Sequence, residues 1–154
     1  MSTEISVERE IAAPPERVWS LISDVTRMGE WSPETSACQW RGGADAAAVG
    51  RKFKGTNENG KRRWSTDCIV TVADPGRAFA FRVKAGPFNV AEWSYHFEPT
   101  ATGCKVRETW TDRRGKIVTI LGKPVSGVAD RAEHNKAGMV ATLDGLAAVA
   151  EASA

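Results

Sequence analysis

The N-terminal part of the chain first alternates apolar and polar residues and then changes to a helical spacing. Ile5, Val7 and Ile11 alternate with acidic and polar residues, and this period of two predicts a half-buried strand. After two consecutive prolines, apolar residues recur at helical spacing and predict a short helix over residues 16–24, because proline is tolerated in the first turn of a helix. A second helical turn is predicted over residues 26–31.

Turn sequences divide the next part of the chain into strands. Asn59-Gly60 is a strong hairpin signal, because both residues of a type I′ turn need positive φ, and further turns that contain glycine and proline follow. The runs between these turns have strand composition and cover residues 52–58, 62–73, 78–85, 90–98 and 104–113, with a further strand expected at 35–41. Closely spaced turns without an intervening helix predict antiparallel neighbours.

After Pro124 the apolar residues follow the spacing of an α-helix. They predict one long C-terminal helix of about 25 residues, whose apolar positions are Val125, Val128, Ala129, Ala132, Met139, Val140, Leu143, Leu146, Ala147 and Ala150. Charged residues, including Arg131, are expected on its other faces. An apolar sheet face must be covered, and only this helix is long enough. The sequence therefore predicts an α+β protein with a seven-stranded antiparallel sheet, formed by residues 1–154 as a single domain.

One helix cannot fill the concave side of so wide and twisted a sheet, so a cavity is expected between the sheet and the helix. Strand alternation identifies the residues that face it. They are Phe53, Gly55, Asn57, Trp64, Thr66, Cys68, Val70, Val72, Phe79, Phe81, Val83, Trp93, Tyr95, Phe97, Val106, Glu108 and Trp110. The residues selected as candidate ligand contacts are Trp64, Thr66, Phe79, Phe81, Trp93, Tyr95, Glu108, Trp110, Asn135 and Met139.

Glu108 interrupts the apolar face of its strand. A carboxylate between Val106 and Trp110 must be paired, hydrated or protonated, because burying it alone costs several kcal/mol. One interpretation is a general acid/base or a ligand-binding group. The alternative is a structural ion pair, for which Arg9 is the candidate partner because it shares the inner face of the first strand.

The other candidates also allow two interpretations. Tyr95, the only tyrosine, is a candidate catalytic or ligand-binding group, or a core residue whose hydroxyl is satisfied by a neighbour. Trp64 and Trp110 either stack on a flat ligand or fill core volume. On the long helix, Asn135 or His134 is expected to face the cavity, with His134 more suited to an exposed position. Trp19 and Trp31 are expected to pack the short helices against the sheet edge.

The composition excludes several classes of protein. The 154 residues carry 21 Lys and Arg against 19 Asp and Glu, a net charge of +2 with both signs scattered, so nucleic acid is not an expected partner. The N-terminus lacks a signal peptide and no apolar segment is long enough to span a membrane, so we expect a cytoplasmic protein without stable membrane association. The widely spaced Cys38, Cys68 and Cys104 indicate free thiols rather than a zinc site. Neither a metal nor another cofactor is expected, and the chain is expected to be a monomer or a homodimer.

The segment AAPPERVWSLISDVTRMGEWSP at residues 12–33 resembles the opening of the polyketide cyclase/dehydrase branch of the START-like (SRPBCC, Bet v 1-like) superfamily. The match falls on Ala13, Pro14, Glu16, Val18, Trp19, Asp24, Trp31 and Pro33. Residues 93–103 and 139–151 are similar to the penultimate strand and terminal helix of that family. The resemblance covers essentially the whole chain and implies a helix-grip fold, in which the sheet wraps around the C-terminal helix. It does not identify a reaction, because its members include cyclases and lipid and hormone carriers.

Three functions remain open on this basis. The favoured hypothesis is binding of a small hydrophobic ligand, such as a polyketide-, lipid- or sterol-like molecule, because few inward polar groups are visible and catalysis usually needs several. The second is a polyketide cyclase/dehydrase in which Glu108 or Tyr95 moves protons. The third is a protein-interaction module similar to the chaperone activators that share the fold.

Overall fold

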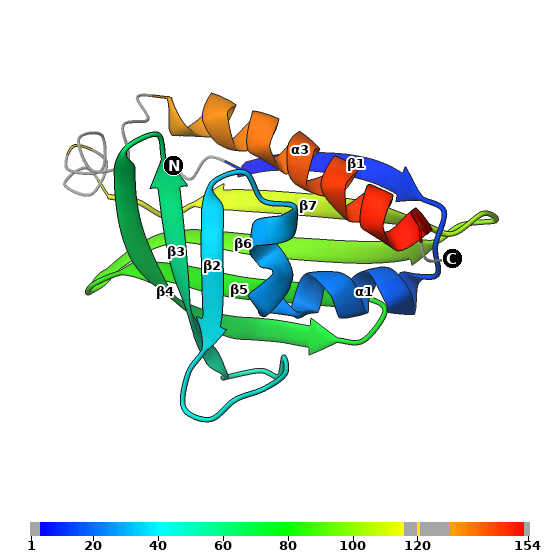
Figure 1. Ribbon diagram of the computed structural model, residues 1–154, viewed down its shortest axis with the longest axis horizontal. Coiled ribbons are helices and arrows are strands. Elements are labelled where there is room, and N and C mark those ends of the chain that lie inside the picture. The colour runs from blue at the N-terminus through cyan, green and yellow to red at the C-terminus, as the bar shows by residue number, and fades with distance from the viewer. Residues whose placement is uncertain (1–3, 116–119, 121–129, 153–154) are drawn as a thin grey trace.

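The computed structural model describes residues 4–115, 120 and 130–152. The elements in chain order are β1 (Glu4–Ile11), α1 (Pro15–Ser23), the 3₁₀ helix η1 (Val25–Glu30), β2 (Thr35–Trp40), β3 (Lys52–Asn59), β4 (Arg62–Asp74), β5 (Ala78–Ala85), β6 (Phe88–Pro99), β7 (Cys104–Asp112) and α3 (Arg131–Ala152). The strands form a seven-stranded antiparallel sheet in the order β1-β7-β6-β5-β4-β3-β2 (Figure 1). The predicted α+β helix-grip architecture is confirmed.

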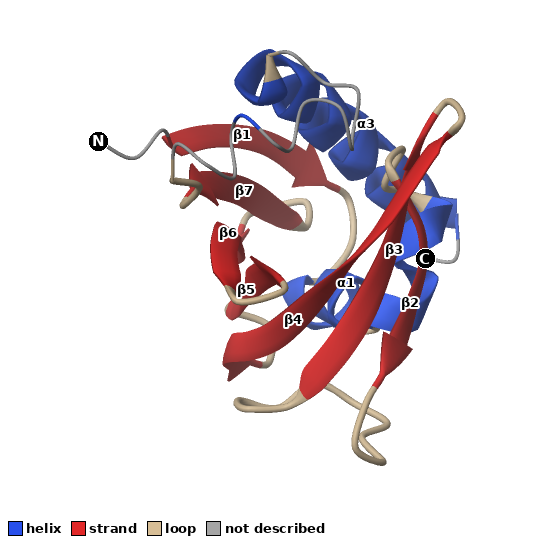
Figure 2. Cartoon of the chain, turned by 90° about the vertical axis from the view of Figure 1, so that its left-hand side faces the viewer, coloured by secondary structure: helices blue, strands red, loops and turns tan. Residues whose placement is uncertain are grey.

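The sheet is strongly curved, and α3 runs across its concave side (Figure 2). Helix α3 lies beside β1, to which it is joined by an ion pair between Arg9 and Asp144 with an N–O distance of 2.6 Å. At the other edge, η1 packs against β2. The concave face is therefore bounded by α3 on one side and by η1 and β2 on the other.

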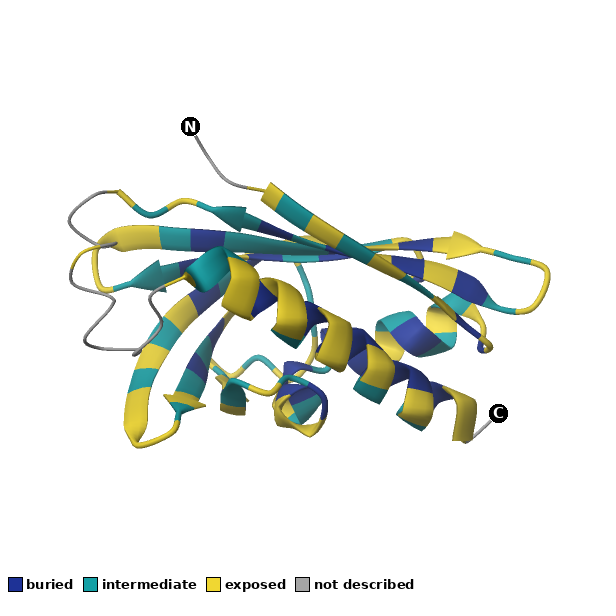
Figure 3. Ribbon diagram, turned by 90° about the horizontal axis from the view of Figure 1, so that it is seen from above, coloured by how far each residue is buried: buried dark blue, intermediate teal, exposed yellow. Residues whose placement is uncertain are grey.

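Helix α3 buries one face and exposes the other (Figure 3). Its buried residues include Met139, Leu143, Leu146, Ala147 and Ala150, as the helical spacing predicts. Val140 was grouped with them but is 47% exposed, because it follows Met139 by one residue and so turns away from the sheet. The expected start of this helix before residue 130, with Val125, Val128 and Ala129, lies outside the described residues.

In strand β4, the predicted inward position of Val72 is wrong. The inner residues of this strand alternate as expected up to Val70, which is buried, but Val72 is 39% exposed. The pairing with β5 shifts between Val70 and Val72, so that Val72 lies opposite Ala80 and Ala73 opposite Phe79. One extra residue in a strand reverses the alternation beyond it, and Ala73 takes the inward position that was predicted for Val72.

The β3–β4 hairpin forms at the predicted place with a different turn. Asn59 pairs with Arg62, so the two turn residues are Gly60 and Lys61. Only Gly60 has a positive φ, of 63°, which is the pattern of a type II′ turn with glycine at its first central position. Asn59 is thus the last residue of β3, and the predicted type I′ turn is wrong.

One end of the concave face is closed by α1 and the C-terminal half of α3. The indole Nε1 of Trp19 donates a hydrogen bond to the Ala78 carbonyl oxygen at 2.8 Å, and Arg17 Nε donates to the Ala150 carbonyl oxygen at 3.1 Å. Trp31 is buried beside Gly145 of α3, where a Cβ atom would lie 3.0 Å from the Cβ of Trp31. Trp31 therefore packs on α3, and open space is left towards the other end.

Candidate ligand-binding site

A cavity of about 680 Å³ lies between the inner face of the sheet and α3. Its walls come from β2 to β7 and from α3, and the loop between η1 and β2 forms part of its mouth. A volume of this size is within the range of roughly 300–1,000 Å³ that is typical of sites for small molecules. The cavity thus lies where a curved sheet with a single covering helix is expected to leave one, and its volume suits a small molecule.

Aromatic side chains supply much of the wall. Besides Tyr95, the Phe and Trp residues that line the cavity are Phe53, Trp64, Phe81, Phe88, Trp93 and Trp110. The rings of Trp93 and Trp110 have centroids 6.5 Å apart, and Phe53 meets Phe81 edge-on at 5.2 Å. Such a wall offers large flat apolar surfaces to a ligand.

The polar pair on the inner face is formed by Tyr95 of β6 and Glu108 of β7. The two residues lie directly opposite each other in the antiparallel register, so their side chains leave the same face of the sheet. Tyr95 Oη donates a hydrogen bond to Glu108 Oε2 at 2.6 Å, and both residues line the cavity. Glu108 is only 2% exposed, and its Oε1 is buried without a hydrogen-bond partner among the described residues.

Burial controls the protonation of this pair. It raises the pKa of Glu108 to about 8, against an opposing effect of the hydrogen bond from Tyr95. The pKa of Tyr95 is raised well above its usual value by burial and by the neighbouring Glu108. Both groups are therefore largely uncharged at neutral pH, since desolvation disfavours the ionised form of an acid.

Arg9 is not the partner of Glu108. It lies on the inner face of β1 opposite Val106, whereas Glu108 lies opposite Val7. Its guanidinium Nη1 instead binds Asp144 of α3. The hypothesis of an Arg9–Glu108 ion pair is wrong, because the helix brings its own carboxylate to the arginine.

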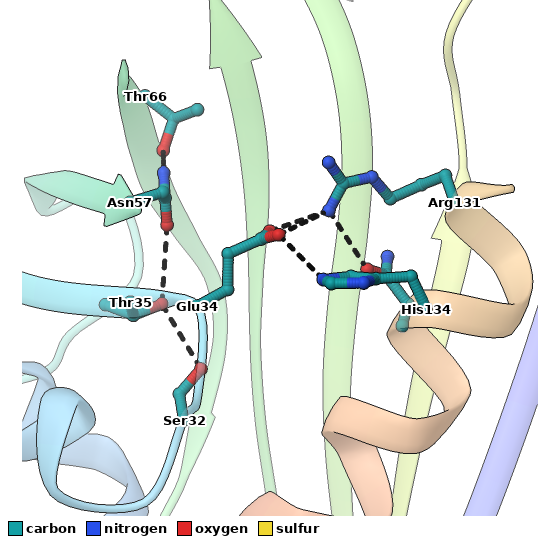
Figure 4. A network of polar contacts seen from close by, with 8 residues as sticks. Ser32, Glu34, Thr35, Asn57, Thr66, Arg131 and His134 are labelled. Carbon is teal, nitrogen blue, oxygen red and sulfur yellow. Dashed lines mark hydrogen bonds and ion pairs between the residues drawn. The ribbon is translucent and has the colours of Figure 1, made fainter. Parts of the chain in front are cut away.

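A second polar group lies at the mouth of the cavity, where the η1–β2 loop faces the start of α3 (Figure 4). Arg131 Nη1 donates to both carboxylate oxygens of Glu34 at 2.7 and 2.9 Å and lies 3.3 Å from the amide oxygen of Asn135. His134 Nε2 lies 2.9 Å from Glu34 Oε2. The guanidinium carbon of Arg131 is also 5.8 Å from the ring centroid of Trp64. We call Glu34, Arg131, His134 and Asn135 the mouth cluster.

A row of weaker contacts continues from the mouth onto the sheet. The Ser32 hydroxyl donates to Thr35 at 3.3 Å, Thr35 donates to Asn57 at 3.4 Å, and Asn57 donates to Thr66 at 3.4 Å (Figure 4). All four residues line the cavity. Its mouth is therefore more polar than its aromatic interior.

Most of the candidate ligand contacts selected from the sequence line this cavity. They are Trp64, Thr66, Phe81, Trp93, Tyr95, Glu108, Trp110, Asn135 and Met139. Phe79 is not among the lining residues and is fully buried. It lies one position past Ala78, whose carbonyl binds Trp19 of α1, and so belongs to the closed end of the concave face.

Glu34 was not among the predicted site residues, and Arg131 was predicted on the wrong face of its helix. Arg131 was expected on an outer face of the helix, but its side chain is only 12% exposed and lines the cavity. A signal for this position exists, because Arg131, Asn135, Met139 and Thr142 recur at intervals of four, four and three residues, which places them on one helical face. His134 is among the more exposed residues, as expected, although it also borders the mouth.

Comparison with known proteins agrees with this arrangement. Residues 2–151 match the family described as polyketide cyclase / dehydrase and lipid transport. The chain belongs to this family. No curated protein matches the chain, and no helix in the described ranges is both long and apolar enough to cross a membrane.

Several solved structures share the fold of this polyketide cyclase/dehydrase family member. The di-domain ARO/CYC StfQ from the steffimycin biosynthetic pathway has a TM-score of 0.77 at 13% identity, over 99% of this chain and 52% of that chain. Major latex-like protein 151 from Panax ginseng has a TM-score of 0.73 at 10% identity, covering 97% of this chain and 98% of that one. The Polyketide_cyc-like protein Cgl2372 from Corynebacterium glutamicum has a TM-score of 0.58 at 31% identity, covering 97% and 90%. These likenesses confirm the expected Bet v 1-like fold.

Proposed function

We propose that the protein binds a small hydrophobic ligand in the cavity between the sheet and α3. The observation that carries this proposal is an aromatic-walled space of about 680 Å³, because apolar walls with few polar groups are typical of small-molecule sites. The wall suits a polyketide-, lipid- or sterol-like molecule. Flat rings can stack on Trp64, Trp93 and Trp110, and the family description supports a ligand of these classes.

A neutral fluorescent probe, 2-(dimethylamino)naphthalene, tests this proposal. The matched variants are Ala91→Phe, at a buried position that lines the cavity, and Ser94→Phe, on the opposite face of the same strand. We expect the probe to bind the unmodified protein, and Ala91→Phe to weaken binding about tenfold or more because the new ring occupies the site. Ser94→Phe should leave binding unchanged. Equal affinity in all three proteins would contradict the proposal.

Native mass spectrometry of protein purified from its own host identifies the ligand class. A co-purifying hydrophobic molecule that is absent from the Ala91→Phe protein supports binding in the cavity. The mass of that molecule separates acyl, sterol and aromatic ligands.

A second candidate is proton-transfer catalysis of the cyclase/dehydrase type. It is favoured by Glu108, whose pKa of about 8 lies near neutral pH, beside a tyrosine in the cavity wall, because a general acid works best when its pKa lies near the working pH. Incubation with a reactive poly-β-ketone separates the candidates. Binding alone predicts no acceleration over buffer, whereas catalysis predicts an acceleration that Glu108→Gln removes.

A further inference from the structure

Glu108 lines the cavity, and one oxygen of its side chain has no hydrogen-bond partner in the described residues. Glu108 Oε2 accepts the hydrogen bond from Tyr95, but Oε1 of the same carboxyl group is buried and has no partner. Buried polar atoms are nearly always hydrogen-bonded, and one left unpaired costs stability. Because Glu108 lines the cavity, its unpaired Oε1 points to a ligand atom that pairs with it.

The surroundings of Glu108 decide which hydrogen-bonding role Oε1 has. Tyr95 donates to Oε2, so in the neutral acid the proton resides on Oε1, which then acts as a donor. The pKa of Glu108, raised by burial, favours this form at neutral pH. A donor inside an apolar cavity is complementary to an acceptor on the ligand, such as a carbonyl oxygen.

Nearby charged groups do not counteract the effect of burial on the pKa of Glu108. On β1, the inward Arg9 binds Asp144 of α3. At the mouth, Arg131 and His134 bind Glu34. These groups are engaged with one another, and none of them contributes to the pKa of Glu108.

The remaining titratable groups of the wall are two thiols, Cys38 and Cys68, and two charged groups with ion-pair partners, Glu58 and Arg114. Burial raises the pKa of the Cys38 thiol to about 11 and that of Cys68 to about 12. Arg114 of the cavity wall forms an ion pair with Asp112 at 2.9 Å. Glu108 therefore has Tyr95 as its hydrogen-bond partner. Burial is the main influence on its protonation state.

We infer that the uncharged Glu108 carboxyl group donates a hydrogen bond through Oε1 to a carbonyl oxygen of the ligand, so that the cavity selects neutral aromatic ketones over hydrocarbons of the same shape. This inference rests on the proposed binding of a ligand in the cavity. It assigns Glu108 as the specificity-determining residue and Tyr95 as the group that positions it. Ionisation of Glu108 removes the donor and places a negative charge beside the ketone oxygen, so ketone selectivity is present below the pKa of Glu108 and lost above it.

Two naphthalene probes test the inference. The first is 6-propionyl-2-(dimethylamino)naphthalene, whose emission shifts to the red when its ketone accepts a hydrogen bond. The second is 6-propyl-2-(dimethylamino)naphthalene, which has nearly the same shape but carries a methylene group in place of the carbonyl. At pH 6 we expect the ketone to bind about tenfold or more tightly than the second probe, because its oxygen pairs with a buried group that is otherwise unsatisfied. At pH 9.5 this advantage should disappear together with the red-shifted emission.

Two variants of Glu108 distinguish the role of its hydrogen-bond donor from the role of its ionisable charge. Glu108→Gln keeps a permanent N–H donor and should retain the ketone advantage at both pH values. Glu108→Met has no donor and should lose the advantage at both, which provides a test at pH 6 that does not depend on the stability of the protein at high pH. The second probe serves as the control for an intact cavity in every protein.

The outcomes distinguish the inference from the proposed function. If both probes bind equally in the unmodified protein at pH 6, ketone selection is wrong, while ligand binding in the cavity stands. If neither probe binds, both ideas are overturned. If the ketone advantage survives in Glu108→Met, another group recognises the carbonyl and the assignment of Glu108 is wrong.

Discussion

Two of the glutamates that line the cavity, Glu34 and Glu108, lie in opposite electrostatic settings. Glu34 at the mouth binds Arg131 through both oxygens and also contacts His134. Glu108 has one neutral donor, Tyr95, and one oxygen without a partner. Glu34 is 23% exposed as a side chain, whereas Glu108 is 2% exposed as a residue. The comparison separates a carboxylate held by an arginine from a carboxyl group that burial keeps neutral.

This difference indicates what each glutamate does in the cavity. The mouth cluster joins the η1–β2 loop to α3 with partners already in place, so its role is to hold two segments together. Glu108 is on β7, which is hydrogen-bonded to β1 on one side and to β6 on the other, and this pairing fixes its position without its side chain. A carboxyl group that is not needed to hold the fold, and that is buried with an unpaired oxygen, is better explained by a ligand.

The largest expected effect is the loss of folding stability between the ordinary pKa of Glu108 and its raised pKa in the folded protein. Its pKa is raised from 4.5 to about 8 in the folded protein, so its contribution to stability is present below pH 4.5 and is lost as the pH rises towards 8. Relative to Glu108→Gln, the free energy of unfolding of the unmodified protein should fall by up to roughly 5 kcal/mol over this range. Urea unfolding of both proteins at pH 5, 6.5, 8 and 9 measures the difference.

The other carboxylates titrate in both proteins, so their effects cancel in this comparison. A difference that stays constant with pH would show that Glu108 keeps an ordinary pKa in the folded state. A difference of the opposite sign would show that the carboxylate is paired with a cation, as Glu34 is.

Tyr95→Phe is expected to have the next largest effect. The variant leaves Glu108 Oε2 without its donor, which should lower the free energy of unfolding by about 1–3 kcal/mol. The loss should be greater at pH 9 than at pH 5, because the hydrogen bond from Tyr95 lowers the pKa of Glu108 and so favours the charged form. In a Glu108→Gln background the loss should no longer depend on pH. The same loss at pH 5 and pH 9 in the unmodified background would contradict the assigned hydrogen bond.

The inward positions of Glu108 and Tyr95 could be predicted from the sequence. Both lie on strands joined by a short turn, and strand alternation places their side chains on the inner face. The partner assigned to Glu108 was wrong because the choice of Arg9 ignored α3, whose rotation about its axis brings Asp144 to Arg9. Alternation also misplaced Val72, because the bulge in β4 has no clear signal in the sequence.

The mouth cluster could not be found in the same way. Glu34 and Arg131 are 97 residues apart in the chain, and Glu34 lies in a loop to which no alternation rule applies. The charge of Arg131 suggested an exposed face, while its helical spacing to Asn135 and Met139 indicated the inner one. Long charged side chains can line a cavity by extending along apolar surface to a partner, and that partner becomes visible only in three dimensions.

The smallest effect is expected at the mouth. Side chains of Glu34 and Arg131 are 23% and 12% exposed, and a partly exposed ion pair of this kind is worth about 1 kcal/mol. A double-mutant cycle with Glu34→Gln and Arg131→Gln should give a coupling energy of this order at low salt, and the coupling should shrink in about 1 M NaCl because ions screen exposed charges. The pH-dependent difference between the unmodified protein and Glu108→Gln should persist at that salt concentration, because it arises from burial rather than from a nearby cation. If salt weakens both effects to the same extent, the two glutamates do not differ as their surroundings indicate.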